Sequence, residues 1–400
     1  MSSSEIIQQR LNSRQTQALI AGILGLVIWL VFGFRDPQQF FRSYIFAFMF
    51  WAAVPLGCLG ILLVHHLTGG WWGYPIRRVV EAGTRTLPVV FVLFLPLLWS
   101  LRITPEDHRL YLWAQPAMVA SDPIIHFKSP YLNPGFFTIR AVIYFAIWIL
   151  IATLLNKWSA EQDRTANPVL KSRMSSLSGP GMVIFVVILT LAVVDWVMSL
   201  EPHWFSTMYG FIFLVTDGLA GLSFSILVIR SLSDQEPLKD CLPPKRFIDL
   251  GNMMLAMVLL WAYLSFSELL IIWAGNLKNE IPWYKERAFG GWASVGAVLL
   301  LFHFFVPFFL LLQRRVKRRL VVLARVAALL FLVTILDIYW IIVPSYEVKA
   351  PHVHLQDLLG LIGLGGLWVA AFFWQYKKWP LLPLHDPRYE GIALEHSHGD

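Results

Sequence analysis

The sequence predicts an all-α integral membrane fold in which ten helices cross the bilayer. Of its 400 residues, 57% are hydrophobic and 14% are charged, whereas soluble domains average about 25% charged residues. The apolar residues gather in ten runs, each near the roughly 20 residues that a helix needs to cross the hydrocarbon core. The expected spans are 18–34, 44–67, 86–101, 137–155, 179–200, 207–229, 250–274, 291–312, 321–343 and 356–375.

The distribution of Lys and Arg sets the expected orientation, because cytoplasmic loops hold an excess of both. The N-terminus, the loops after even-numbered spans and the C-terminus hold 21 of the 32 basic residues, whereas the loops after odd-numbered spans hold 9. The basic run 314–319 is the strongest single anchor. We therefore expect a multi-pass protein of the cell (inner) membrane whose ends, 1–17 and 376–400, are both cytoplasmic.

Charge and cysteine content exclude several kinds of site. The net charge is +7, but the basic residues lie in loops separated by spans and form no continuous track for nucleic acid. Cys58 lies in a span and Cys241 in a loop. They form no CxxC motif for zinc, iron–sulfur clusters or c-type haem, and a disulfide between them is not expected. No two histidines on facing helices share one depth, which argues against b-type haem.

The first three spans place histidines and one acid at the cytoplasmic side. About seventeen mostly polar residues precede span 1, so it is expected to insert without cleavage. Span 2 ends in His65 and His66, ahead of two glycines. Interfacial histidines before a glycine cap are the alternative to a proton-carrying pair. Glu81 precedes span 3 on the same side.

Spans 4 and 5 carry opposite charges near the outer face. Arg140 lies near the outer start of span 4 and is expected to snorkel or to pair with an acid. Asp195, Ser199 and His203 follow at intervals of four, so they would share one face and could pass a proton if the helix continued that far. Pro202 argues for an earlier end. An Asp that bonds neighbouring backbone groups is the structural alternative.

Spans 6 and 7 each contain an acid. Asp217 lies near the middle of span 6 and is followed by glycines that allow close helix packing, so a packing role stays open. Glu268 lies late in span 7, near the outer face, where Ser265 and Ser267 could solvate a path. Asp249 lies on the cytoplasmic side. Together with Glu81 and the pair His65 and His66, it is placed to complete that path.

Spans 8 and 9 add a histidine and a third outer acid, whereas span 10 is expected at the periphery. His303 lies near the middle of span 8, where a satisfied core histidine is the alternative, and Asp337 lies in the last third of span 9. A charge at the bilayer centre costs roughly 3 kcal/mol and usually faces a protein interior or a water path. The residues expected to form a proton pathway are Asp195, Asp217, Glu268, His303, Asp337, His203, Ser265, Ser267, His65, His66, Glu81 and Asp249.

Two short patterns recur four spans apart. The order base, base, two apolar residues, acid, apolar residue and glycine occurs at 77–83 and again at 245–251. Spans 5 and 9 each contain an Asp seven residues before a Pro. These matches predict that 44–200 and 207–343 are two four-helix bundles in a parallel repeat, with spans 1 and 10 outside them.

The longest outer loop, 102–136, is rich in Pro and His. Loops of this length often bind something. A docking surface for another subunit and an active-site lid are both open interpretations of it.

Four segments form long and specific motifs. They are HHLTGGWWG at 65–73, DWVMSLEPHW at 195–204, the stretch from WAGN to IPWY at 273–284, and LLPLHDP at 381–387. Together they resemble the ActF-subunit family of bacterial alternative complex III, within the NrfD-like membrane subunits of polysulfide-reductase-type complexes. The resemblance covers nearly the whole chain.

This resemblance implies ten spans in two four-helix bundles plus two, and a non-catalytic membrane subunit without a redox cofactor of its own. The expected complex, in a respiratory or photosynthetic chain, oxidises menaquinol or another quinol and reduces a cytochrome c-type or copper protein. Partner subunits would carry the iron–sulfur clusters and the c-type haems of multihaem cytochromes. A homologous ActC-like subunit would bind quinol, and small membrane subunits and lipids would surround them. A structural role and a proton-translocation pathway are the expectations for this subunit.

Two other functions stay open. The repeat and the buried acids also suit a proton-coupled secondary transporter, for which Pro55, Gly57 and Pro96 are modest support as sites of broken helices. A purely structural scaffold subunit is the other. Purification separates the first two, because a transporter isolates alone whereas the expected subunit comes with haem and iron–sulfur partners.

Overall fold

The computed structural model describes residues 3–103, 105–235, 238, 244–347, 350–383 and 385–386. Across these residues the chain is all-helical, and nine helices are long and apolar enough to cross a membrane. The bent pair α3 (Arg77–Thr84) and α4 (Leu87–Ser100) makes a tenth span if its parts are counted together. The predicted all-α membrane fold is confirmed, and the count of ten depends on this pair. Cys241 and 387–400 of the expected C-terminal tail lie outside the described residues.

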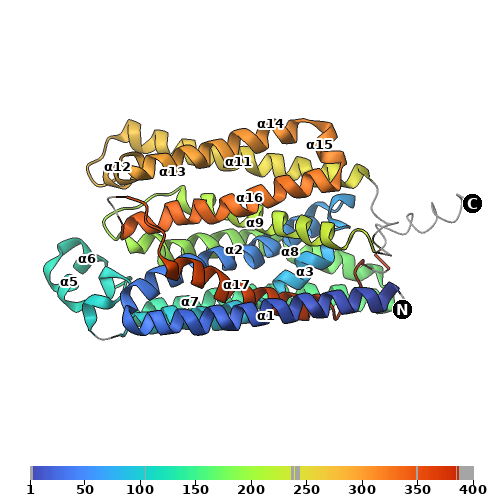
Figure 1. Cartoon of the computed structure of the whole chain (residues 1–400), viewed down its shortest axis with the longest axis horizontal. Helices are drawn as coiled ribbons and strands as arrows, with labels where there is room; N and C mark the ends of the chain where they lie inside the picture. The colour runs from blue at the N-terminus through green and yellow to red at the C-terminus, as the bar shows by residue number, and fades with distance from the viewer. Residues whose placement is uncertain are drawn as a thin grey trace, which may run out of the picture.

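The long helices lie side by side along the longest dimension of the molecule (Figure 1). They are α1 (Ser3–Arg35), α2 (Pro37–Thr68), α7 (Pro134–Thr165), α8 (Pro168–Trp196), α9 (Tyr209–Leu232), α11 (Pro244–Gly275), α13 (Gly291–Leu299) continued through η5 (Leu300–Phe305) into α14 (Val306–Leu312), α16 (Leu320–Ile342) and α17 (Leu355–Tyr376). Short helices connect them: η1 (Trp71–Gly73), η2 (Glu106–His108), η3 (Leu112–Ala114), α5 (Pro116–Ser121), α6 (Pro123–Lys128), η4 (Met198–Leu200), α12 (Ile281–Ala288), α15 (Arg314–Arg318) and η6 (Val343–Ser345).

The polar residues ahead of the first apolar run continue α1 instead of forming a separate arm. Arg14 Nη1 donates to Ser231 Oγ at the end of α9, over 2.6 Å. Lys377 Nζ, just after α17, donates to Asn12 Oδ1 over 2.8 Å. The described part of the expected segment 1–17 is therefore helical and bound to two neighbouring helix ends.

The expected span 86–101 corresponds to α4 alone, which is too short to cross the hydrocarbon core. Its 14 residues rise about 21 Å at 1.5 Å per residue, against a core about 30 Å thick. α3 supplies the remaining length at an angle of 40°. Pro88 in the first turn of α4 lacks an amide hydrogen and favours a new helix start there. A search for apolar runs misses α3 because Arg77, Arg78 and Glu81 lie in it.

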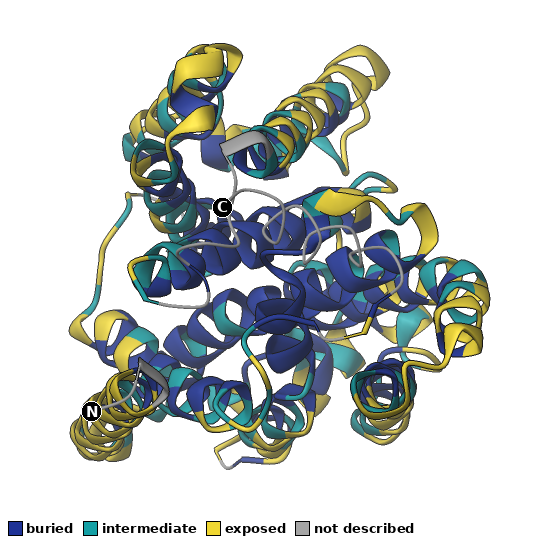
Figure 2. Ribbon diagram, turned by 90° about the vertical axis from the view of Figure 1, so that its right-hand side faces the viewer, coloured by how far each residue is buried: buried dark blue, intermediate teal, exposed yellow. Residues whose placement is uncertain are grey.

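The centre of the molecule is the crossing of α2 and α9, the two most buried of the candidate spans. Figure 2 shows this buried centre inside a ring of helices whose outer faces are exposed. Gly57 touches the α9 backbone, since a Cβ there would lie 1.8 Å from the carbonyl oxygen of Asp217. Gly221 faces α2 in the same way, and its Cβ would lie 2.8 Å from the amide nitrogen of Cys58. Glycines at both positions permit this backbone contact.

The helix contacts fall into two sets with α1 and α17 paired at one edge. α2 packs against α3, α4 and α8, and α7 packs against α4 and α8. In the other set α9 packs against α11 and α16, and α16 packs against α13. α2 packs closely against α9, and α8 also packs against α9, so the two sets are in extensive contact. The expected 44–200 and 207–343 bundles, and their relation as a parallel repeat, stay predictions.

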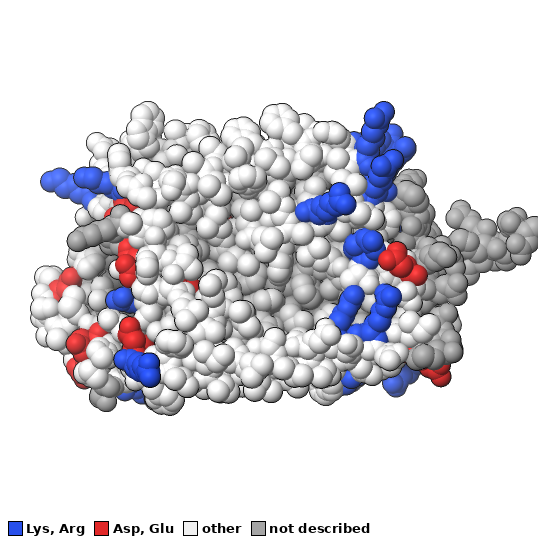
Figure 3. Space-filling view, viewed as in Figure 1, with Lys and Arg blue, Asp and Glu red and all other residues white. Residues whose placement is uncertain are grey.

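Charge separates the two ends of the molecule. Lys and Arg gather at the end that holds the N-terminus and α15, here called the basic end (Figure 3). A broad uncharged belt separates them from a mixed group at the opposite end, here called the loop end because it carries residues 102–136. The belt is the surface expected against lipid. Assignment of the basic end to the cytoplasm stays a prediction.

The loop 102–136 folds onto the chain's own loop end. The hydroxyl of Tyr111 donates to the carbonyl of Trp196 over 2.8 Å, and Trp113 Nε1 donates to Ser199 Oγ over 3.1 Å. These contacts hold the loop over the end of α8. Phe127 projects from it, 84% exposed. A docking surface for another subunit therefore stays a prediction for this loop.

Acidification is expected to loosen the α6 part of this loop. Asp122 Oδ1 accepts from the amides of Ile124 and Ile125, and Oδ2 lies 2.6 Å from His203 Nε2. The Ile125 amide, followed by His203, lowers the pKa of Asp122. A carboxyl with a lowered folded-state pKa stabilises the fold above its unfolded pKa of about 3.9, and this stabilisation is lost as pH falls through the folded value.

Amide exchange measures this effect. After correction for intrinsic rates, protection of the Ile124 and Ile125 amides should be full at neutral pH and should fall progressively as the pH is taken below about 3.9. Asn133 is the matched control, because it caps α7 by accepting from the Phe136 amide and cannot titrate. Equal protection of the two Ile amides at neutral pH and throughout this acid range would contradict the prediction.

Candidate functional site

The buried acids divide into those with a cationic partner and those without. Asp195 has one, since Arg140 on α7 binds it through two nitrogens, with Nε 2.7 Å from Oδ2 and Nη2 2.9 Å from Oδ1. Tyr144 donates to Oδ2 over 2.8 Å. The guanidinium also lies over the Tyr131 ring, 3.8 Å from its centroid. Of the two outcomes expected for Arg140, pairing is observed, and it makes Asp195 part of a structural ion pair.

Asp195, Ser199 and His203 do not form the row expected from their spacing. α8 ends at Trp196, and Ser199 lies in η4. Ser199 donates to the backbone carbonyl of Asp195 over 2.5 Å, not to its carboxylate. His203 lies at the surface beside Asp122. The condition for a shared face is not met, because the helix ends before Pro202, as that proline suggested, and an interval of four then no longer keeps residues on one face.

Glu81 at the basic end is paired as well. Its Oε1 lies 3.0 Å from Arg77 Nε and its Oε2 lies 2.6 Å from Arg78 Nη1. Ser159 on α7 donates to Oε1 over 2.6 Å. Arg77 also binds Asp386, beyond α17. These contacts join α3, α7 and the segment after α17, so Glu81 has a structural role here.

Asp337 on α16 is the first acid without a cation. Its residue is 2% exposed. Oδ2 accepts from Thr216 Oγ1 over 3.1 Å and from Trp261 Nε1 over 3.2 Å. Within the described part of the chain no salt bridge reaches it. Two neutral donors, one on α9 and one on α11, therefore hold this carboxylate.

Glu268 on α11 is the second buried acid without a cationic partner. Ser206 donates to Oε1 over 2.5 Å and the Tyr284 hydroxyl donates to Oε2 over 3.0 Å. Burial and the adjacent Glu268 raise the pKa of Tyr284, which keeps its hydroxyl a donor. The nearby cation of α12, Arg287, is instead bound to Glu201 over 2.7 Å. Glu268 makes no salt bridge to any residue that the structure describes.

Glu268 and Asp337 line one cavity of about 620 Å³. Residues of α11, α12, α13 and α16 form its walls, which are mostly aromatic and aliphatic. Ser265 lines it, as expected for a residue of the path, whereas Ser267 does not. Sites for small molecules have volumes of about 300–1,000 Å³ and apolar walls with a few polar groups. The cavity therefore suits water or a small amphipathic molecule beside two carboxyl groups.

His303 lies next to this group in the π-helical segment η5. Its ring centroid is 4.0 Å from that of Trp261, which in turn donates to Asp337. Neither ring nitrogen has a hydrogen-bond partner among the described residues, so the alternative of a satisfied core histidine does not hold there. Pro307 accounts for the wide turn, because it lacks the amide that would bind the His303 carbonyl and its ring would clash with that carbonyl.

Asp217 is the third acid without a cation. It follows Thr216 on α9 and is 3% exposed. Its carboxylate has neither a hydrogen bond nor a salt bridge to a described residue. The close packing expected from the neighbouring glycines is present, but Gly57 touches the Asp217 carbonyl and not its side chain. Helix packing therefore does not explain the carboxylate.

The groups expected to complete the path at the basic end lie apart from these acids. His65 packs edge-on against Trp72, with 5.2 Å between ring centroids, and His66 lies beside it at 5.6 Å. His65 is about 12 Å along α2 from Gly57 at the α9 crossing. Asp249 is exposed on α11. The structure thus brings together most of the path residues expected toward the loop end, but not Asp195 and His203. The path residues expected toward the basic end lie apart from them.

Several partners of the site were not predictable from sequence. Thr216, Trp261, Ser206 and Tyr284 hold the acids from other helices. Only Thr216 carries a local signal, its position next to Asp217. The others carry no such signal, because aromatic and hydroxyl residues are common near the membrane interface. No protein-family model and no curated protein matches this chain, so its function is argued from this geometry and from its sequence motifs.

Proposed function

We propose that this chain is a membrane subunit of a quinol:electron-acceptor oxidoreductase complex and that it conducts protons past Glu268, Asp337, His303 and Asp217. One observation carries the proton role: Asp217, Glu268 and Asp337 are buried without a salt bridge to a described residue, whereas Glu81 and Asp195 are bound to arginine. Asp357 also has no arginine partner, but it lies in the first turn of α17, where it accepts from Ser43 and from the His354 amide. A cation-free carboxyl can gain or lose a proton without breaking a salt bridge. A paired one would leave an uncompensated buried charge behind.

The contacts support an order for the path. Glu268 lies nearest the loop end, where Ser206 and Tyr284 join it to polar groups outside the spans. The cavity links it to Asp337, and its volume leaves room for water between the two carboxyl groups. Trp261 lies between Asp337, to which it donates, and His303, against which its ring packs. Thr216 donates to Asp337 and directly precedes Asp217, which would be the deepest member of the path.

The assignment to a complex rests on the sequence motifs. In it, iron–sulfur clusters and c-type haems would belong to partner subunits, and the ActC-like partner would bind menaquinol or another quinol. This chain would lie beside them in the cell membrane with both termini cytoplasmic. It would contribute proton transfer and packing surface, and not the redox chemistry.

Neutral replacement of the cation-free acids is expected to uncouple proton release from quinol oxidation. Asp337→Asn and Glu268→Gln keep the side-chain size and remove the carboxylate. With the whole complex in sealed vesicles, electron transfer should continue. Protons released per quinol should fall toward the number that quinol oxidation itself produces. A pH-sensitive dye and the absorbance of the acceptor measure the two quantities together.

Asp249→Asn is the matched control, because Asp249 is an exposed acid on the same helix as Glu268. It should leave the ratio of protons to quinol unchanged. A wild-type ratio in both Asp337→Asn and Glu268→Gln would refute the proton path. Co-purification with haem and iron–sulfur partners tests the assignment to a complex separately.

The cavity favours one second candidate, a proton-coupled secondary transporter. A chamber beside two acids could bind a small substrate and couple it to protons. The expected broken helices do not support it, since α2 and α4 continue through Pro55 and Pro96. Isolation of the chain from native membranes without any haem or iron–sulfur partner would favour the transporter.

A further inference from the structure

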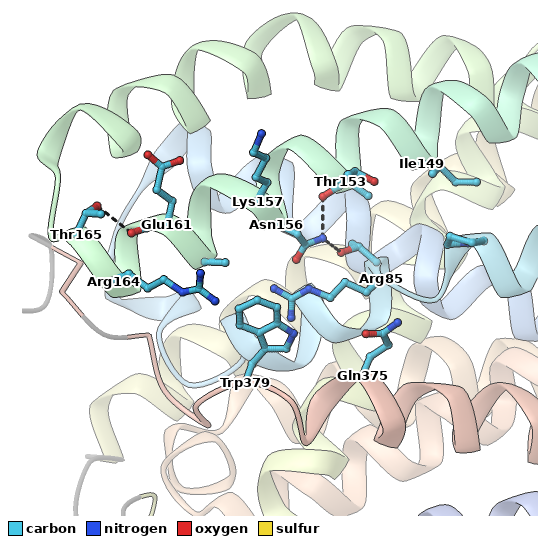
Figure 4. A pocket seen from close by; sticks show the side chains of 14 residues that line it. Arg85, Ile149, Thr153, Asn156, Lys157, Glu161, Arg164, Thr165, Gln375 and Trp379 are labelled. Atoms are coloured by element: carbon cyan, nitrogen blue, oxygen red, sulfur yellow. Dashed lines mark hydrogen bonds between the residues drawn. The ribbon is translucent and has the colours of Figure 1, made fainter.

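A second cavity lies at the basic end, between the α3–α4 break, α7 and the segment that follows α17 (Figure 4). It measures about 700 Å³ and shares no lining residue with the cavity beside Asp337. Arg85, Lys157 and Arg164 line it together with one acid, Glu161. Its charged lining is therefore net positive.

Arg85 has donors without acceptors. Its guanidinium lies over the Trp379 ring, 4.2 Å from the centroid. Neither Nη1 nor Nη2 forms a hydrogen bond within the described residues. Its one salt bridge there is a long one, 3.8 Å from Nη2 to Glu81 Oε2. Glu81 already receives shorter contacts from Arg77 and Arg78, so Arg85 remains available to an anion in the cavity.

The two other cations lie at the mouth. Lys157 and Arg164 are exposed on α7, and neither makes a salt bridge to a described residue. Figure 4 shows the guanidinium groups of Arg85 and Arg164 extending toward each other beside Trp379. Planar guanidinium groups in such a pair match the oxygens of a phosphate, which they can bind through two hydrogen bonds each.

The opposite wall is apolar and leads to the surface expected against lipid. Pro88 of α4 and Ile149 of α7 line the cavity. On the same two helices Val92 and Leu150 are 59% and 58% exposed. A molecule with a phosphate in the cavity could therefore lay hydrocarbon chains along α4 and α7.

We propose that this cavity binds the phosphate of an anionic phospholipid from the leaflet at the basic end. Basic pockets between membrane helices are suited to such headgroups. The apolar wall favours a lipid over a free phosphate, because a small ion would leave that wall unused. This inference is independent of the proton path and of the assignment to a complex.

Lipid retention by the purified full chain tests the proposal. In native mass spectrometry the wild-type chain should retain phosphatidylglycerol about tenfold better than phosphatidylcholine with the same acyl chains. Arg85→Gln should remove this preference. Thr153→Trp should remove it too, because Thr153 is an exposed lining residue and the larger ring would fill the cavity without a change of charge. The second variant keeps the test valid if Arg85→Gln does not fold.

Lys171→Gln with Arg173→Gln is the control for general charge, because both residues are exposed near the start of α8 and do not line the cavity. This double variant should keep the preference, and loss of it there would show a general attraction to the surface and overturn the proposal. A wild-type preference in Arg85→Gln or in Thr153→Trp would also overturn it. Displacement of phosphatidylglycerol by equimolar inorganic phosphate would show a free-anion site instead.

Discussion

Replacement of Arg140 by methionine should destabilise the folded chain by about 3–5 kcal/mol, the usual effect of removing one partner of a buried ion pair. Asp195 is 1% exposed and receives two charged hydrogen bonds from this arginine. After the change Tyr144 would still donate to the carboxylate, but no cation would be paired with it. Equilibrium unfolding in detergent, followed by tryptophan fluorescence, measures the loss.

A double variant separates stability from function at this site. Arg140→Met with Asp195→Leu replaces the pair by apolar side chains and should recover most of the lost stability. It should also keep the wild-type ratio of protons to quinol, because Asp195 lies outside the proposed path. Arg173→Met, an exposed arginine on α8, is the control for loss of charge. Unfolding of Arg140→Met at the wild-type midpoint would rule out the ion pair as a major support of the fold.

Among glycine-to-alanine substitutions in the membrane core, Gly57→Ala should destabilise the fold most. Its Cβ would lie 1.8 Å from the Asp217 carbonyl oxygen and 2.5 Å from the carbonyl carbon. Both atoms belong to the backbone and cannot rotate away. Alanine favours a helix by about 1 kcal/mol over glycine, but overpacking costs about 1–3 kcal/mol and more where backbones must separate. The net effect should be destabilising, with a lower melting temperature in detergent.

Gly179→Ala is the matched control in another membrane helix. Its added Cβ would meet only Leu67 Cδ2 at 3.9 Å, an ordinary contact. Helix propensity should then decide the sign, and this variant should melt at or slightly above the wild-type temperature. The same melting temperature for both alanine variants would mean that α2 and α9 do not cross in backbone contact.

The positions of the long helices were predictable because a bilayer imposes one strong requirement. Apolar runs of sufficient length must be helical, since no water is present to bind their backbone groups. Helix ends were less predictable, because polar residues such as Asn12 and Arg14 continue α1 through contacts with residues at the ends of other helices. α3 was not predicted as part of a span for a related reason. Its charged residues are buried as ion pairs with each other, so no apolar run marks the helix.

Local sequence does not distinguish the buried acids that are paired with arginine from those that are not. Asp195 and Asp337 occupy the same place in their spans, each seven residues before a proline. One is bound to Arg140, from a helix that is 55 residues away in sequence, and the other accepts from Thr216 and Trp261. The presence of a buried acid follows from the sequence. Whether that acid meets an arginine depends on which helices pack together. The spacing of residues along one helix does not reveal this.

The π-helical turn at η5 also has a consequence for helical phase. One additional residue in a turn rotates everything beyond it by about 100°. α13, before the turn, packs against α16, whereas α14, after it, packs mainly against α11. A single membrane crossing thus presents two different stripes to two neighbours. Deletion of one residue within 300–305 would restore a uniform helix at the expense of one of these contacts, so insertions and deletions in this turn act on helix partners as much as on His303.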